Sequence, residues 1–176
     1  MGRQKLLERI DGRSMIERAI DAASAWPTVV VTSDAVAAEL AAAGLAERVD
    51  IVINNEPERG MNRSLALANA AIDAGEPIAV LLGDLPDCDA VAIERVVDEY
   101  DESADVVVPQ AGKRFGHPVV FGPAARRALA ELGDGDGLNA VRDAETLRRR
   151  IVPVSDSGAF EDIDTVDELA ARLARG

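Results

Sequence analysis

The chain has 176 residues, enough for one domain with a sizeable core, and its 32 acidic and 19 basic residues give a formal net charge of −13. This charge repels a phosphate backbone and argues against a nucleic-acid partner. No apolar run approaches the ~20 residues of a membrane span, and the N-terminus has no signal-type apolar segment. We therefore expect residues 1–176 to form a single cytoplasmic domain with no membrane partner.

The composition limits the chemistry further. A single cysteine, Cys88, excludes an intramolecular disulfide framework and a cysteine-cluster zinc site. A single histidine, His117, excludes a histidine-rich metal site. The basic residues include only two lysines, Lys5 and Lys113. An acidic excess with scarce lysine is typical of halophilic cytoplasmic proteins, in which high salt screens the self-repulsion. The alternative is an ordinary acidic protein from a GC-rich genome.

Short apolar runs alternate with amphipathic stretches along the chain. A capping box at Ser14 predicts a helix that ends at Trp26-Pro27. The apolar runs predict strands over residues 28–32, 49–53, 77–82, 105–109, 118–121 and 150–154. Further helices are predicted over residues 34–43, 64–74, 89–100, 123–132, 137–148 and 165–175. This alternation predicts an α/β fold of three layers, with helices on both faces of a mostly parallel, mixed sheet.

Ligands bind to such sheets at the carboxyl ends of the strands, and acidic residues stand at two of these positions. Asp84 follows the most apolar strand, after Gly83, where a carboxylate can hold a divalent ion and glycine allows a ligand to approach closely. Asp162 and Asp164 are two apart in an extended segment and point to one side. Magnesium prefers such hard oxygen ligands. The alternatives are an ordinary turn aspartate and acids that stabilise a helix N-terminus.

Two further segments are candidates for ligand binding. Gly116-His117-Pro118 places the only histidine just before a strand, although a hydrogen-bonded turn histidine is the simpler interpretation. Residues 58–65 form a glycine-bearing loop that enters a helix and offers N–H donors to an anion or a base edge. The sequence contains no G-x-G-x-x-G, Walker A or G-x-S-x-G motif, and Cys88 has no histidine nearby to activate it.

In chain order, these segments resemble the MobA-like NTP transferases, nucleotidyltransferases with a GT-A-like (nucleotide-diphospho-sugar transferase) fold, and most closely their molybdenum cofactor cytidylyltransferase branch. The resemblance spans nearly the whole chain, and its motifs are fairly specific in their joint order. The matching residues are Met1-Gly2, Lys5-Leu6-Leu7, Asp11-Gly12, Asn55, Pro57, Gly60-Met61, Ser64-Leu65, Leu82-Gly83-Asp84, Pro86, Gly116-His117-Pro118-Val119 and Asp162-Ile163-Asp164-Thr165.

The resemblance implies a reaction and a set of roles. A phosphate of the acceptor, here molybdopterin, would attack the α-phosphorus of CTP or GTP and release pyrophosphate. Asp84 and Asp164 would hold Mg²⁺ on the nucleotide, and Lys5 would face its phosphates. Gly83 would lie at the nucleotide, and Gly60, Met61 and Ser64 near its base and ribose. The segment Gly116-His117-Pro118 would border the acceptor. Nucleotidyl transfer needs positioning and charge neutralisation more than a protein nucleophile, which agrees with the residues present.

The sequence departs from the family at its start. The family begins with an apolar strand and a glycine-rich triphosphate loop, and this chain starts inside that loop, at Met1-Gly2. Either the start is assigned too far downstream, which the intact later motifs favour, or the chain is naturally shortened and inactive. A missing central strand would leave exposed sheet edges and favour a homo-oligomer. Alternative functions are a 2-phospholactate-type guanylyltransferase and a non-catalytic nucleotide- or cofactor-binding relative that partners a molybdoenzyme or its maturation system.

Overall fold

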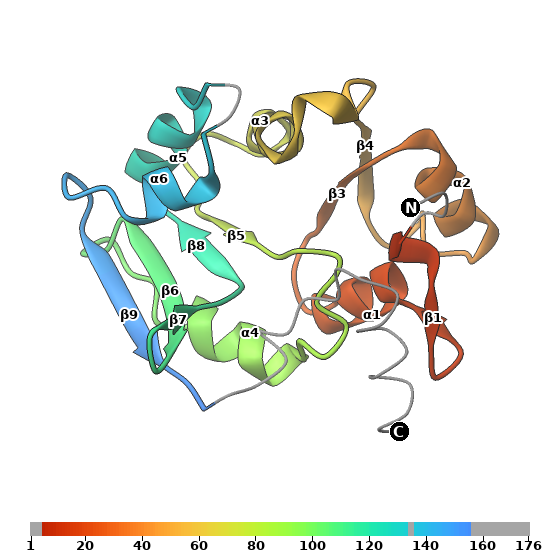
Figure 1. Cartoon of the computed structure of the whole chain (residues 1–176), viewed down its shortest axis with the longest axis horizontal. Coiled ribbons are helices and arrows are strands. Elements are labelled where there is room, and N and C mark those ends of the chain that lie inside the picture. Colours follow the sequence, from red (N-terminus) through yellow and green to blue (C-terminus); the bar gives the residue numbers. More distant parts are fainter. Residues whose placement is uncertain (1–4, 134–135, 156–176) are drawn as a thin grey trace.

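The computed structural model describes residues 5–133 and 136–155. Within these ranges it contains the predicted alternation of strands and helices (Figure 1). The helices are α1 (Met15–Ala22), α2 (Asp34–Ala42), α3 (Met61–Ala71), α4 (Ala90–Val97), α5 (Pro123–Ala130) and α6 (Leu138–Arg142), with short 3-10 helices η1 (Lys5–Leu7) and η2 (Pro57–Arg59). The strands are β1 (Arg9–Ile10), β2 (Arg13–Ser14), β3 (Val29–Thr32), β4 (Asp50–Ile53), β5 (Ile78–Val80), β6 (Val106–Ala111), β7 (Arg114–Phe115), β8 (Val119–Phe121) and β9 (Arg149–Pro153).

Five strands form a mixed sheet in which β7 and β8 run against β5, β6 and β9. β5 and β6 both pair antiparallel with β8, and β6 pairs parallel with β9, so β5, β6 and β9 run in one direction. β3 and β4 form a separate parallel ladder, with Val29 opposite Asp50 and Thr32 opposite Ile53. Within the described residues the two ladders share no strand pairing, and β3 and β5 each pair with a single strand. The predicted α/β class with a mostly parallel sheet is confirmed.

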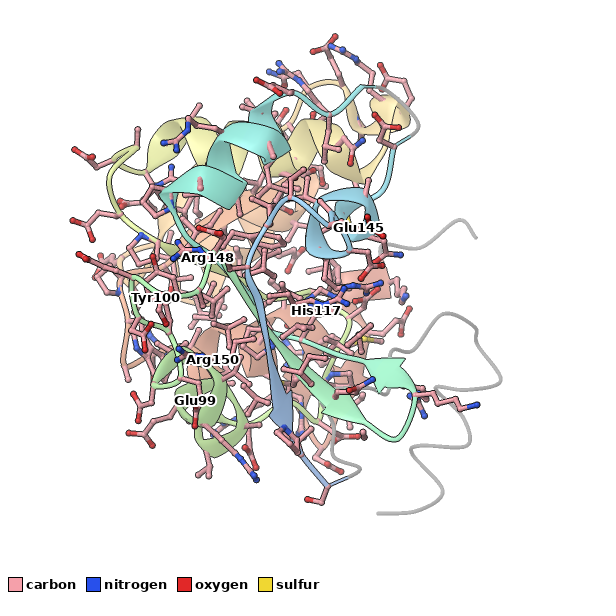
Figure 2. The ribbon with its side chains drawn as sticks, turned by 90° about the vertical axis from the view of Figure 1, so that its left-hand side faces the viewer. Glu99, Tyr100, His117, Glu145, Arg148 and Arg150 are labelled. Carbon is pink, nitrogen blue, oxygen red and sulfur yellow. The ribbon has the colours of Figure 1, made fainter. Side chains whose placement is uncertain are left out.

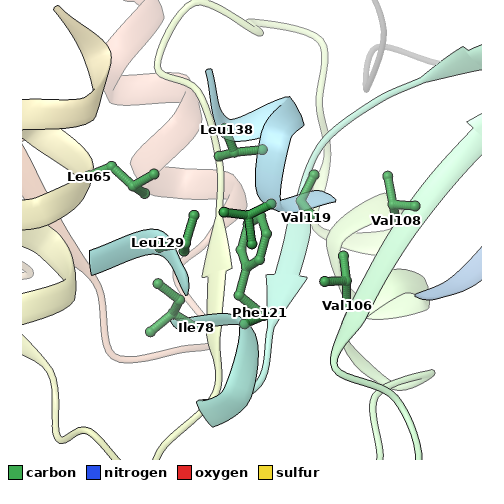
Figure 3. Packing of buried hydrophobic residues seen from close by; sticks show 10 residues of the cluster. Leu65, Ile78, Val106, Val108, Val119, Phe121, Leu129 and Leu138 are labelled. Atoms are coloured by element: carbon green, nitrogen blue, oxygen red, sulfur yellow. The ribbon is translucent and has the colours of Figure 1, made fainter. Parts of the chain in front are cut away.

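Helices cover both faces of the sheet, as the apolar strands require. Figure 1 shows α3, α5 and α6 on one face and α1 and α4 on the other. The first face packs around Phe121, which is fully buried among residues of α3, α5, α6 and the strands (Figure 3). On the second face, α4 contributes Val96 to a cluster with Val107 and Val152. The predicted three-layer arrangement is therefore confirmed.

Several element boundaries differ from the prediction. The helix predicted over residues 137–148 ends at Arg142, and the one predicted over 64–74 spans Met61–Ala71. The hairpin of β1 and β2 was not predicted, although its Asp11-Gly12 turn, with both φ angles positive at 52° and 84°, is typical of a two-residue hairpin. The helix predicted over residues 165–175 lies outside the described residues. Among the helices of the described ranges, none is long and apolar enough to cross a bilayer.

Candidate active site

Lys5 and Asp84, 79 positions apart in the sequence, meet in the structure. The Nζ atom of Lys5 donates a hydrogen bond to Oδ2 of Asp84 at 3.0 Å. Both side chains are about three-quarters buried, with 23% and 26% of their surface exposed. The other carboxylate oxygen, Oδ1, is buried and accepts no hydrogen bond from the part of the chain that the structure describes. The pair therefore leaves one oxygen of Asp84 available to a further ligand.

The loop that carries Asp84 is fixed by close packing. A Cβ atom at Gly83 would lie 3.3 Å from side-chain carbons of both Leu6 and Ile16, so glycine lets η1 and α1 approach the loop. Leu85 is 3% exposed and anchors the next turn. Arg18 of α1 donates from Nε to the carbonyl oxygen of Pro86 at 2.8 Å. These contacts hold Asp84 at the carboxyl end of β5.

The segment Gly116-His117-Pro118 lies against the same strand. Nδ1 of His117 is 3.1 Å from the carbonyl oxygen of Val80, the last residue of β5. Because a carbonyl oxygen only accepts, Nδ1 carries the proton in this contact. The His117–Pro118 peptide bond is cis, and Pro118 is buried. The histidine segment and the Asp84 loop therefore flank one end of the sheet. Figure 2 labels His117 to the right of β9.

The start of α3 holds a second group of predicted residues. Gly60 precedes the helix with φ +81° and ψ −170°, a conformation that is essentially restricted to glycine. Met61 is 52% exposed, which is unusual for a large apolar side chain. Oγ of Ser64 accepts a hydrogen bond from Nδ2 of Asn54 at 3.0 Å. This contact joins the helix to the carboxyl end of β4.

Asn54 was not selected from the sequence, although it stands directly after an apolar strand. Its side chain is buried, and Oδ1 accepts a hydrogen bond from the backbone N–H of Glu56 at 2.9 Å. It therefore fixes both the polar loop and Ser64. Among the described residues, no hydrogen bond or ion pair joins Gly60, Met61 or Ser64 to Asp84. The structure thus places the predicted residues in two groups.

Asp164 and Cys88 also bear on the predicted chemistry. Asp164, the expected second metal ligand, lies outside the described residues. Cys88 is buried near the Asp84 loop, and burial raises the pKa of its thiol to about 11. A thiol with this pKa is protonated at neutral pH and is a poor nucleophile. The burial of Cys88 therefore agrees with the prediction that it is not a nucleophile.

The residues present fit a divalent metal that is shared with a ligand. Asp84 offers a hard carboxylate with one buried oxygen that lacks a partner among the described residues. The described residues contain no group of three or more His, Cys, Asp or Glu side chains that could enclose an ion by themselves. Magnesium is commonly held by one or two carboxylates together with phosphates and water. The site is suited to an ion that arrives with a phosphorylated ligand.

The chain belongs to the MobA-like NTP transferase domain family, whose model matches residues 1–151. Phosphoenolpyruvate guanylyltransferase of Streptomyces avermitilis is 29% identical over 165 residues, which cover 92% of this chain and 72% of that protein. The bifunctional protein GlmU of Thermotoga maritima is 30% identical over 104 residues, or 59% of this chain. The chain spans only 23% of the length of that GlmU.

Solved structures share the fold at lower sequence identity. Rv0371c of Mycobacterium tuberculosis superimposes with a TM-score of 0.84 at 21% identity, over 99% of this chain and 90% of that chain. A manganese complex of Rv0371c gives a TM-score of 0.82 at 22% identity, over 97% and 91%. The molybdopterin-guanine dinucleotide biosynthesis protein A of Archaeoglobus fulgidus gives 0.70 at 17% identity, over 99% and 91%. These likenesses confirm the GT-A-like nucleotidyltransferase fold.

Proposed function

We propose that this protein is a metal-dependent nucleotidyltransferase that uses CTP or GTP. An oxygen of the acceptor's phosphate forms a bond to the α-phosphorus, and the bond from that phosphorus to the β-phosphate bridge breaks, which releases pyrophosphate. The observation that carries the proposal is the meeting of Lys5 and Asp84 at the end of β5, with one oxygen of Asp84 lacking a partner among the described residues. Membership of the MobA-like family supports it.

Each residue of the two groups has a proposed task. Asp84 and Asp164 hold Mg²⁺, which when bound neutralises charge on the phosphates. Lys5 donates to phosphate oxygens, and Gly83 keeps the loop close to the nucleotide. The base and ribose lie at Gly60, Met61 and Ser64, where Met61 is exposed and Asn54 holds the Ser64 hydroxyl. The acceptor lies beside Gly116, His117 and Pro118.

We propose molybdopterin as the acceptor, on the basis of the Gly116-His117-Pro118 segment held at the end of β5. A second candidate is a small phosphorylated carboxylic acid of the phosphoenolpyruvate or 2-phospholactate type. The observation that favours it is the 29% identity to a phosphoenolpyruvate guanylyltransferase over 92% of this chain. A non-catalytic nucleotide-binding role is the third candidate, and it predicts binding without turnover.

The test is pyrophosphate release, with each nucleoside triphosphate supplied in turn with molybdopterin, phosphoenolpyruvate or 2-phospholactate. We expect one combination to react only with Mg²⁺ or Mn²⁺, and Asp84→Asn to abolish it. Asp98→Asn removes an equal charge from an exposed position after α4 and should react like the wild type. If Asp84→Asn keeps wild-type turnover, the role of Asp84 is wrong. If no combination reacts, the catalytic proposal fails.

A further inference from the structure

We propose that the Lys5 ammonium group and the divalent metal compete for Asp84, and that the phosphates of the nucleotide end this competition by drawing Lys5 away. The inference rests on the proposed function, because it concerns the order in which that site is filled. It assigns Lys5 a regulatory part besides phosphate binding. Metal alone then binds weakly, and metal and nucleotide bind together.

The distance between Lys5 and Asp84 explains why the ammonium group and a metal ion compete. Lys5 Nζ lies 3.0 Å from Oδ2 of Asp84, an ordinary N–H···O hydrogen-bond distance between two oppositely charged groups. A metal ion bound to either oxygen of this carboxylate would lie beside the ammonium group, and like charges at such a distance repel. Only about a quarter of each side chain is exposed, so water screens this repulsion incompletely. The carboxylate therefore favours one cation at a time.

The packing of the N-terminal segment fixes the backbone next to Lys5, whereas the lysine side chain is flexible. Leu6 packs against Gly83, and both Leu6 and Leu7 pack against the cluster of Ile16, Ile20 and Val30. The backbone next to Lys5 is thereby tied to the Asp84 loop. The lysine side chain itself is a flexible stem with a single point charge, unlike the planar guanidinium of arginine, which grips a carboxylate through two parallel bonds. The side chain can exchange partners while its backbone stays in place.

Lysine at position 5 is notable, because 17 of the 19 basic residues in this chain are arginines. Described carboxylates such as Asp105, Asp101 and Asp143 pair with arginine side chains. Asp84 instead pairs with one of only two lysines. A triphosphate offers Lys5 several anionic oxygens in place of the Asp84 carboxylate. By linkage, whatever the nucleotide gains in affinity from bound metal, the metal gains from bound nucleotide.

The experiment measures Mn²⁺ binding without nucleotide, from the electron paramagnetic resonance signal of free Mn²⁺ at low ionic strength. We expect Lys5→Met to bind Mn²⁺ roughly five- to 150-fold more tightly than the wild type, the usual span of coupling between two ligands. Lys5→Arg should bind no more tightly than the wild type, because it keeps the charge. Lys113→Met removes the only other lysine and controls for net charge. Asp84→Asn should remove the gain in the Lys5→Met background.

Lys5→Gln, which keeps a polar side chain, must shift affinity in the same direction and replaces Lys5→Met if that variant does not fold. Mn²⁺ affinity that is unchanged or weaker in the folded charge-removing variant would overturn the inference. Pyrophosphate release separates the two proposals. If the wild type turns over but Lys5→Met and Lys5→Gln bind Mn²⁺ no more tightly than the wild type, only the competition between Lys5 and metal is contradicted. If these variants bind Mn²⁺ more tightly but the wild type shows no turnover, only the proposed reaction is contradicted.

Discussion

At the scale of single residues, Gly60 has the clearest conformational requirement. Its φ of +81° with ψ of −170° is accessible essentially to glycine alone, and a Cβ atom added there would meet no other atom within 4 Å. We expect Gly60→Ala to lower the free energy of unfolding by about 1–3 kcal/mol through backbone strain. Urea unfolding measures this change. Because the space is open, a loss near zero would mean that the residue adopts another conformation in solution.

The pairing of Lys5 with Asp84 could not be obtained from residue patterns. A lysine near the N-terminus and an aspartate after a strand are common features, and 79 positions separate them. Only the resemblance to a family predicted that both serve one site. By contrast, Asn54 gave a usable signal, a polar residue directly after the apolar run Ile51–Ile53. That Asn54 bonds Ser64 depends on how α3 packs beside the end of β4, which a sequence pattern does not specify.

At the scale of elements, Arg126 holds the end of α3. Its guanidinium group is buried and donates to the carbonyl oxygens of Asn69, Ile72, Asp73 and Glu76 and to the side chain of Asn69. The last carbonyl groups of a helix lack intrahelical donors. Arg126 supplies donors to two residues at the end of α3, Asn69 and Ile72, and to two in the turn that follows. Burial lowers the pKa of Arg126, yet the group stays charged.

We expect Arg126→Met to lower the free energy of unfolding by about 3 kcal/mol or more, because it removes a buried, charged donor that serves four carbonyl oxygens at once. The exposed neighbour Arg127→Met is the matched control and should stay within about 0.5 kcal/mol of the wild type. Denaturant unfolding of both variants checks this. Equal losses in the two variants would show that general effects of arginine removal, and not the helix end, dominate.

Among the described residues, strand β9 pairs only with β6, and arginines that precede it and lie within it hold it in place. Arg148 donates from Nε and its backbone N–H to Oδ2 of Asp105, each at 2.9 Å, and from Nη2 to Oδ1 at 2.8 Å. Arg150 pairs with Asp101 in the turn that follows α4. Figure 2 shows Arg148 and Arg150 beside Tyr100 and Glu99. The hydrogen bonds from Arg148 lower the pKa of Asp105 from 3.8 to about 2.

This depressed pKa predicts a dependence of stability on pH. Asp105 stabilises the fold above its unfolded pKa near 3.8, and the contribution is lost as the pH falls towards the folded value of about 2. We expect Asp105→Asn to be less stable than the wild type at neutral pH and to lose less stability between these two values. Arg148→Met should flatten the same part of the profile. Unfolding free energies that fall equally steeply in wild type and Asp105→Asn would contradict this assignment.

Element positions were predicted better than element ends. Each predicted strand within the described residues exists, because β-branched apolar runs such as Val29–Val31 favour the strand conformation. The helix predicted through residue 148 fails because Arg149 donates to the carbonyl oxygen of Arg142 and to Asp143, and both arginines lie over the ring of Phe115. These tertiary contacts stop the helix at a place where its local pattern would continue.

At the scale of the whole molecule, the net charge of −13 should make stability depend on salt. The screening length falls from about 30 Å at 0.01 M salt to about 3 Å at 1 M, so self-repulsion across the surface fades over this range. We expect the thermal midpoint to rise with KCl and, equally, with NaCl. A midpoint that stays constant or falls would show that local ion pairs outweigh the net charge.

Thermal unfolding with CTP, GTP, ATP and UTP, each with and without Mg²⁺, tests whether Asp84 forms part of a nucleotide site. A ligand that binds only the folded state stabilises it by about 2.7 kcal/mol at a hundredfold excess over its dissociation constant. We expect a Mg²⁺-dependent rise with CTP or GTP in the wild type and in Asp98→Asn, and none in Asp84→Asn. No rise with any nucleotide, or an equal rise in Asp84→Asn, would contradict a nucleotide site built on Asp84.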